Sequence, residues 1–178
     1  MKFIYKQNEN KSLIVEDRIF GKIIIQYPFS KIVLTKEMQR LAEISQNGFS
    51  QIEFKELEKN DRLHHSIGAF HIMSLFLQKL ENILNNFGIK LSQEDKDIAL
   101  CSMLLHDIGH GPFSHSLEII TDYSHEKRTT DILLGNTEVN KVITEIFGPK
   151  KVKKIASFIA EINDEEDLGK DSFTKLLN

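Results

Sequence analysis

The chain has 178 residues, a length that suits one domain with a core large enough to fold without disulfides or a structural metal. Hydrophobic residues make up 40% and charged residues 28% of the sequence, which is typical of a globular protein and excludes a disordered or fibrous one. The formal net charge of −3 gives no general basic field for nucleic acid. No run approaches the roughly 20 apolar residues that a membrane span needs. We therefore expect neither strong nucleic-acid binding nor a membrane partner.

The only cysteine, Cys101, stands inside an apolar run, so the chain has no disulfide framework. The first residues are too polar for the apolar core of a secretory signal. Both observations favour a cytoplasmic location.

A short-period, β-branched pattern over residues 12–34 predicts a small β-hairpin. We expect residues 1–34 to form an appendage to the rest of the chain. A first helix is predicted over residues 36–46, because Thr35 is a suitable N-cap and Gly48 a suitable stop.

The remaining pattern is helical. Residues 49–61 lack a clean period and indicate a loop, whereas apolar residues recur at three- and four-residue steps over residues 62–87 and predict a long core helix that Asp61 caps. The fold class is therefore mainly α, a helical bundle over residues 35–178 with a small N-terminal β-hairpin. Further helices are predicted over residues 92–105, 113–120, 125–134, 137–147 and 151–162.

The segment Leu105–His115 reads LHDIGHGPFSH and places three histidines and an aspartate at a Gly/Pro break after an apolar run. Six of the seven histidines lie between His64 and His115. Residues of this kind in such a place usually hold a metal. A helix-end histidine paired with an aspartate is the simpler alternative.

His106 and Asp107 are about 100° apart around a helix axis, so another element must complete a metal shell. His65 is the best source, because Gly68 and Ala69 one turn later let a second helix approach closely. Imidazole and carboxylate ligands together suit Zn, Mn, Fe or Co better than Mg or Ca. By contrast, His64 and His71 are expected to be packed or surface residues.

At these positions the sequence resembles HD-domain phosphohydrolases, specifically the deoxynucleoside triphosphate triphosphohydrolase branch. The string HDIGHGPFSH is the most specific part of the resemblance. The matching segments, in the family's order, are Gln39–Leu41, Arg62–Gly68, His106–His115 with Glu118, and His125–Glu126.

The resemblance implies one site for a divalent transition metal, namely Mn, Fe, Zn, Co or Ni, with Mg as a further candidate. It implies that the substrate is a nucleotide and that the full-length form is a homo-oligomer. The implied metal ligands are His65, His106 and Asp107; the implied catalytic cluster is His110, His115, Glu118 and His125; the implied substrate contacts are Arg62 at phosphate, Gln46 at the sugar 3′-hydroxyl and Asn47 near C2′.

Two departures from the family pattern modify these expectations. Asn47 stands where the family often has an apolar residue, which argues against strict selectivity for deoxyribose. Family members also carry a further metal-ligand aspartate just downstream of a segment like residues 172–178. We therefore expect this chain to be the N-terminal part of a longer enzyme and to hydrolyse nucleotides poorly by itself.

The favoured function is hydrolysis of a (deoxy)nucleoside triphosphate to a nucleoside and inorganic triphosphate. One alternative is a non-catalytic or regulatory HD module. Another is an HD phosphodiesterase that acts on a different nucleotide phosphoester.

Overall fold

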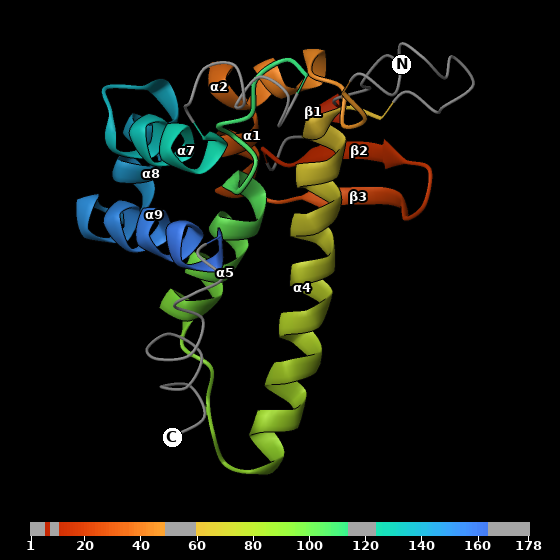
Figure 1. The fold of residues 1–178 in the computed structure, drawn as a ribbon. Helices are drawn as coiled ribbons and strands as arrows, with labels where there is room; N and C mark the ends of the chain where they lie inside the picture. The colour runs from red at the N-terminus through yellow and green to blue at the C-terminus, as the bar shows by residue number, and fades with distance from the viewer. Residues whose placement is uncertain (1–5, 8–10, 49–59, 114–123, 164–178) are drawn as a thin grey trace.

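The protein is described here by a computed structural model, which describes residues 6–7, 11–48, 60–113 and 124–163. Near the N-terminus an antiparallel sheet has the order β1-β2-β3 (Figure 1). The predicted hairpin is confirmed, and β1 is an additional strand that the pattern did not indicate. The strands are β1 (Lys6–Gln7), β2 (Leu13–Asp17) and β3 (Gly21–Ile25).

Three short helical elements follow the sheet: α1 (Phe29–Val33), α2 (Lys36–Gln39) and the 3₁₀ helix η1 (Arg40–Glu43). The prediction of one continuous helix over residues 36–46 is therefore wrong, and α1 was missed. The Thr35 hydroxyl donates to the Ile32 carbonyl instead of capping α2. Ile44 is extended, and its carbonyl accepts from the N–H of Arg62 at 2.9 Å, so this tertiary pairing ends the helical segment early.

The long predicted helix is present as α4 (Arg62–Asn86), and the Asp61 side chain caps it by accepting from the N–H of His64. α5 (Gln93–Leu105) runs back beside α4 and is capped by Ser92. The remaining helices also agree with the sequence pattern: α7 (His125–Leu134), α8 (Glu138–Phe147) and α9 (Pro149–Asn163).

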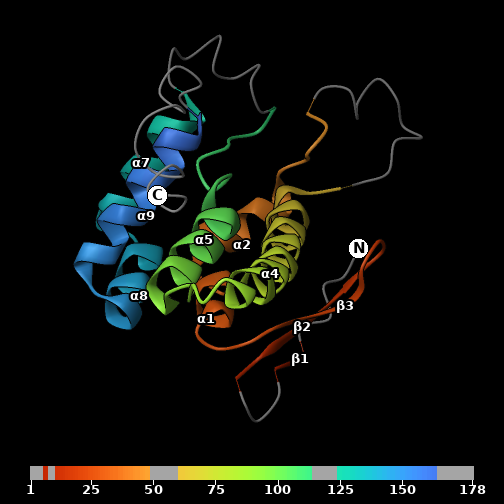
Figure 2. The same ribbon diagram turned by 90° about the horizontal axis from the view of Figure 1, so that it is seen from below.

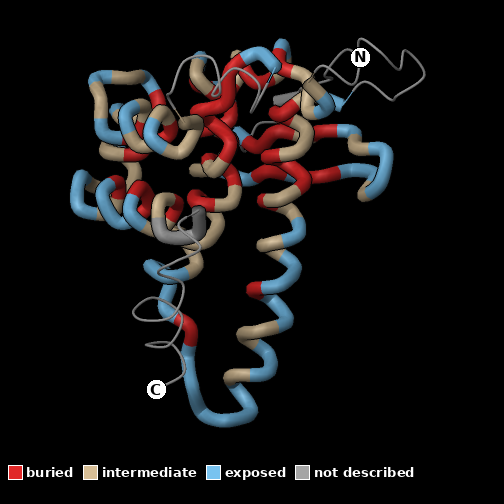
Figure 3. Tube along the Cα trace, viewed as in Figure 1, coloured by how far each residue is buried: buried red, intermediate tan, exposed pale blue. Residues whose placement is uncertain are grey.

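The sheet and the last three helices lie on opposite sides of the two central helices, α4 and α5. Figure 2 shows the sheet on the α4 side of the α4–α5 pair and α7, α8 and α9 on the α5 side. α9 packs against α5, α7 and α8. The first half of α4 is largely buried, whereas its second half extends away from the body and leaves Leu75, Phe76 and Ile83 about half exposed (Figure 3).

One apolar core joins the sheet to the helices. It includes Leu13 and Ile25 of the sheet, Leu63 and Ile67 of α4, and Leu104 of α5. The expected fold class, mainly α with a small N-terminal β element, is confirmed. The division at residue 34 stays a prediction. The expected helix over residues 113–120 falls mainly, and residues 164–178 entirely, outside the described residues. None of the helices in the described ranges has the length and apolar character that a membrane crossing requires.

Candidate metal centre

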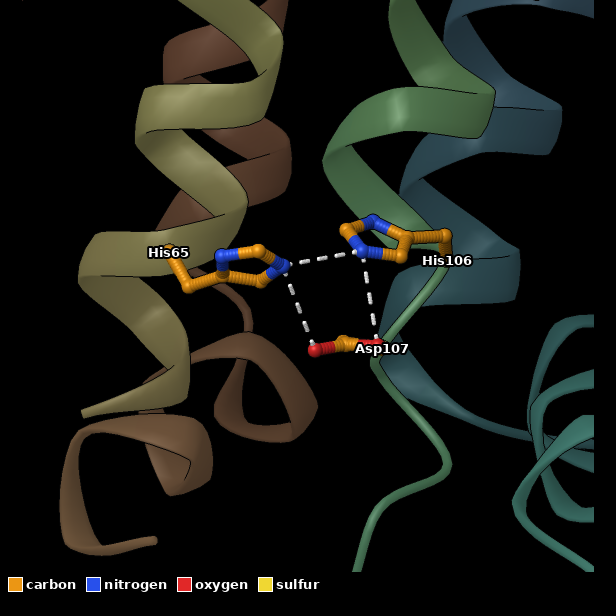
Figure 4. Close-up of side chains that lie close together, drawn as sticks. All are labelled: His65, His106 and Asp107. Carbon is orange, nitrogen blue, oxygen red and sulfur yellow. Dashed lines mark hydrogen bonds and ion pairs between the residues drawn. The ribbon is translucent and has the colours of Figure 1, made fainter. Parts of the chain in front are cut away.

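Three of the predicted site residues point toward one another from two helices. His65 lies in the first turn of α4, His106 follows the last residue of α5, and Asp107 comes next (Figure 4). The Nε2 atoms of His65 and His106 are 3.3 Å apart. Asp107 places Oδ2 3.7 Å from the His65 Nε2 and Oδ1 3.4 Å from the His106 Nε2. The three side chains therefore form a group that could hold a metal ion.

A hydrogen bond favours the tautomer of His106 that can bind a metal through Nε2. The His106 Nδ1 lies 2.9 Å from the Met103 carbonyl, an arrangement that requires a proton on Nδ1 and leaves a lone pair on Nε2. Burial lowers the pKa of His65; the Asp107 carboxylate opposes this shift, and His106 adds to it. Two imidazole ligands at about 2.1 Å in a tetrahedral shell have nitrogens about 3.4 Å apart, close to the spacing found here.

Asp107 is only 6% exposed, and its carboxylate stays ionised. Burial by itself would raise the pKa of Asp107, but a hydrogen bond from His110 and the charges of His106 and Arg62 outweigh burial and hold that pKa well below its usual range. Arg62 Nη1 donates directly to Asp107 Oδ2. In the described structure, Arg62 thus contacts a member of the candidate metal group, whereas its predicted contact with substrate phosphate stays a prediction.

A second histidine pair adjoins the first group through the same carboxylate. The His110 Nε2 lies 3.4 Å from Asp107 Oδ1, and the His110 ring stacks on His125 with centroids 3.8 Å apart and planes 14° apart. Burial lowers the pKa of His110, which the hydrogen bond to Asp107 partly offsets. Asp107, His110 and His125 also offer ligand atoms within 4.8 Å of one another. The structure therefore brings two of the four predicted catalytic residues next to the candidate metal group.

The turn that carries Asp107 and His110 is held by residues that were not among the predicted site residues. Arg40 donates to the carbonyls of Ile108 and His110 at 2.7 and 2.8 Å. The Thr129 hydroxyl accepts from the N–H of Gly109 at 3.0 Å. A Cβ at Gly109 would lie 2.1 Å from the carbonyl oxygen of His125, so α7 packs directly on this glycine. The motif Gln39–Leu41 was the only sequence signal for Arg40.

The predicted sugar contacts lie close to the segment after His110. A Cβ added to Gly48 would lie 3.5 Å from the Phe113 carbonyl oxygen, so the turn containing Gln46 and Asn47 adjoins that segment. The Gln46 Oε1 is buried and accepts no hydrogen bond within the described residues. Asn47 is exposed. His115 and Glu118 lie outside the described residues, so their roles stay predictions.

Two further histidines contact neighbouring side chains, as the sequence analysis expected. The Nδ1 of His64 lies 2.7 Å from the Asp61 carboxylate, and His71 packs edge-on against Phe20. A cavity of about 570 Å³ lies beside His65 and gives a small molecule room next to the candidate metal group. Its apolar wall is formed by Ile19, Phe20, Ala69, Ile72, Met73, Phe76 and Met103.

Comparison with known proteins identifies the family. The protein-family model described as "HD domain" matches residues 62–174, which include α4, α5 and the candidate metal group. The chain belongs to the HD domain family, and HD domains are metal-dependent hydrolases.

Several relatives support this assignment. YwfO of Bacillus subtilis is 34% identical over 152 residues, which cover 82% of this chain and 34% of YwfO. The deoxynucleoside triphosphate triphosphohydrolase SAMHD1 of Xenopus laevis is 32% identical over 105 residues, or 59% of this chain and 16% of that protein. A phosphohydrolase structure from Bacteroides thetaiotaomicron superimposes with a TM-score of 0.66 at 31% identity, covering 86% of this chain and 35% of the other. The chain thus spans about a third of the length of YwfO and of the Bacteroides protein.

Proposed function

We propose that this chain contributes the catalytic HD centre of a metal-dependent phosphohydrolase that acts on (deoxy)nucleoside triphosphates and releases a nucleoside and inorganic triphosphate. The observation that carries the proposal is the convergence of His65, His106 and Asp107 beside a pair of stacked histidines. The relatives named SAMHD1 support the choice of a nucleoside triphosphate over other phosphoesters.

The proposed ligands are His65, His106 and Asp107, whose two imidazoles and one carboxylate suit a divalent transition metal. A cation bound there would polarise a phosphoryl oxygen and lower the pKa of a water molecule. No further ligand is assigned among the described residues.

The residues around the ligands have separate proposed roles. His110 and His125 present their rings next to Asp107, where an imidazole can donate a proton or a hydrogen bond to a phosphoryl or leaving oxygen. The buried Oε1 of Gln46 offers an acceptor for a sugar hydroxyl. The closeness of residues 46–48 to Phe113 supports a sugar position near the end of this turn.

The test is product analysis on a nucleotide panel. We would incubate the chain with each common deoxynucleoside and ribonucleoside triphosphate and with Mn²⁺, Co²⁺ or Mg²⁺, and identify products by ³¹P NMR and chromatography. The proposal predicts equimolar nucleoside and inorganic triphosphate, dependence on added metal, and loss of both products in His106→Ala. Release of monophosphate or pyrophosphate would contradict it.

The same assay decides between the proposal and its two alternatives. Hydrolysis of cyclic or other nucleotide phosphodiesters, without attack on triphosphates, would indicate a phosphodiesterase. Metal binding with no detectable turnover of any nucleotide would indicate a non-catalytic module, whereas slow release of inorganic triphosphate would support the proposal.

A further inference from the structure

Arg62 is the first residue of α4, and hydrogen bonds hold the backbone in place at this position. Its N–H donates to the carbonyl of Ile44, and the preceding Asp61 caps the helix. The residue is only 4% exposed, although arginine is among the residues least often buried. Its guanidinium group therefore lies among protein atoms and has little contact with solvent.

The guanidinium acts on one particular oxygen of Asp107. Arg62 Nη1 donates to Oδ2, the oxygen 3.7 Å from the Nε2 of His65. The other oxygen, Oδ1, lies 3.4 Å from the Nε2 atoms of both His106 and His110. Because the two oxygens face different partners, the ion pair with Arg62 fixes the rotation of the carboxylate about its Cβ–Cγ bond.

We propose that Arg62 is a positioning residue for metal binding, which holds the Asp107 carboxylate in the orientation that the candidate metal group requires and acts on an ion only through Asp107. The inference rests on the proposed function, because it presumes that this group binds a metal. It differs from a phosphate contact, in which the guanidinium would act on the substrate.

Two physical arguments support this role. A carboxylate that a hydrogen bond from Arg62 already holds in place needs no further ordering when it binds an ion, whereas one that rotates freely must be ordered by the ion itself. Residues that orient a ligand through hydrogen bonds typically change metal affinity by about 10- to 100-fold when they are replaced. A residue that contacts only substrate phosphate would leave metal affinity unchanged in the absence of substrate.

The experiment measures Mn²⁺ affinity by electron paramagnetic resonance, without nucleotide, in the full 178-residue chain. Arg62→Met keeps much of the side-chain length but removes the charge and the donors. We expect it to weaken Mn²⁺ binding by about 10- to 100-fold. Arg62→Lys, which keeps the charge without the planar fork, should weaken binding by less than tenfold. The matched control, Arg18→Met, replaces an exposed arginine in the hairpin and should bind Mn²⁺ within about twofold of the unsubstituted chain.

A parallel titration with inorganic tripolyphosphate separates the two roles. Unchanged Mn²⁺ affinity in Arg62→Met, together with weaker tripolyphosphate binding, would overturn the positioning role and indicate a phosphate contact. If circular dichroism shows that Arg62→Met does not fold, Arg62→Lys decides the question. A loss of Mn²⁺ affinity of threefold or more with unchanged tripolyphosphate affinity supports positioning, whereas unchanged Mn²⁺ affinity refutes it.

Failure of the proposed function would look different. A folded, unsubstituted chain that binds no Mn²⁺ would refute the metal site itself and, with it, the role of Arg62. Equal Mn²⁺ affinity in the unsubstituted chain and in the folded Arg62 variants would refute the positioning role alone.

Discussion

Two histidine pairs share the carboxylate of Asp107, and their rings are oriented differently. The rings of His65 and His106 are tilted by 60° with centroids 5.2 Å apart, and their Nε2 atoms face each other. The rings of His110 and His125 are stacked with planes only 14° apart. An imidazole donates its lone pair in the plane of the ring, so one ion can lie in both planes of the tilted pair.

The stacked pair lacks this property. Its nearly parallel planes, with centroids 3.8 Å apart, do not meet at a position close to both rings. An ion placed between the His110 and His125 nitrogens would lie out of both planes, which weakens ligation. The same residue types beside one aspartate are therefore suited to different tasks: metal binding for the tilted pair, and proton transfer or oxygen binding for the stacked pair.

The largest expected effect comes from separating α7, which carries His125, from the turn that carries His110. In Gly109→Ala the new Cβ would lie 2.1 Å from the His125 carbonyl oxygen and 2.5 Å from the Thr129 nitrogen, so α7 must move away from the turn. We expect a loss of about 3 kcal/mol or more in the free energy of unfolding, or a fall of roughly 6–12 °C in Tm. Calorimetry measures both.

Gly68→Ala is the matched control for this change. Its Cβ would meet only Phe20, at an ordinary contact distance of 3.7 Å, and alanine is the better helix former. Equal destabilisation by the two substitutions would contradict the account of α7 packing on Gly109.

Single substitutions in each pair are expected to have different effects. His106→Ala should abolish both metal binding and nucleotide hydrolysis, because it removes a ligand from the tilted pair. His125→Ala should keep metal affinity within about threefold and lower turnover by about 10²-fold or more, as expected for a lost proton-transfer group. Metal titrations and steady-state kinetics on the two variants measure these effects. A loss of metal binding in His125→Ala would show that the stacked pair holds the ion instead.

A smaller effect is expected from Thr129→Val, which removes the hydroxyl that accepts from the N–H of Gly109. The buried N–H would lose its acceptor, and the unfolding free energy should fall by about 1–3 kcal/mol. Urea titration measures this change. Thr130→Val, one residue later on α7, is the control and should change the unfolding free energy by less than about 0.5 kcal/mol.

The smallest effect is expected from His71→Ala. This residue packs against Phe20 and belongs to neither pair. Its turnover and metal affinity should stay within about twofold of the unsubstituted chain. A tenfold loss of turnover without loss of folding would mean that the face of α4 around His71 takes part in the reaction.

Much of this fold could be predicted because helix caps and apolar periodicity depend on residues that are close together in the sequence. The N-cap aspartate of α4, the apolar recurrence along that helix and the Ser92 cap of α5 all act within a few residues, and each element formed as expected. The segment over residues 36–46 was predicted wrongly, since the pairing of Ile44 with Arg62 overrides its helical pattern. No local signal reports such a pairing.

For the site as well, the sequence predicts some features and not others. His65, His106 and Asp107 could be chosen from ligand chemistry, and the structure brings them together. The close approach of a second helix that was expected at Gly68 does not occur there, because a Cβ at Gly68 would meet only Phe20. Arg40 donates hydrogen bonds to the carbonyls of Ile108 and His110, which lie about 70 residues later in the sequence. Apart from the family motif around Arg40, no sequence pattern predicts these contacts. The stacking of His110 on His125 depends on the packing of α7 against the turn, which no sequence period specifies.

A Co²⁺ titration followed by visible absorption shows which histidines hold the ion, because it reports both stoichiometry and ligand type. If the tilted pair binds the metal, we expect one ion per chain in the unsubstituted protein, loss of the Co²⁺ spectrum in His65→Ala and in His106→Ala, and a nearly unchanged spectrum in His125→Ala. A spectrum that survives in His65→Ala and disappears in His125→Ala would contradict this expectation.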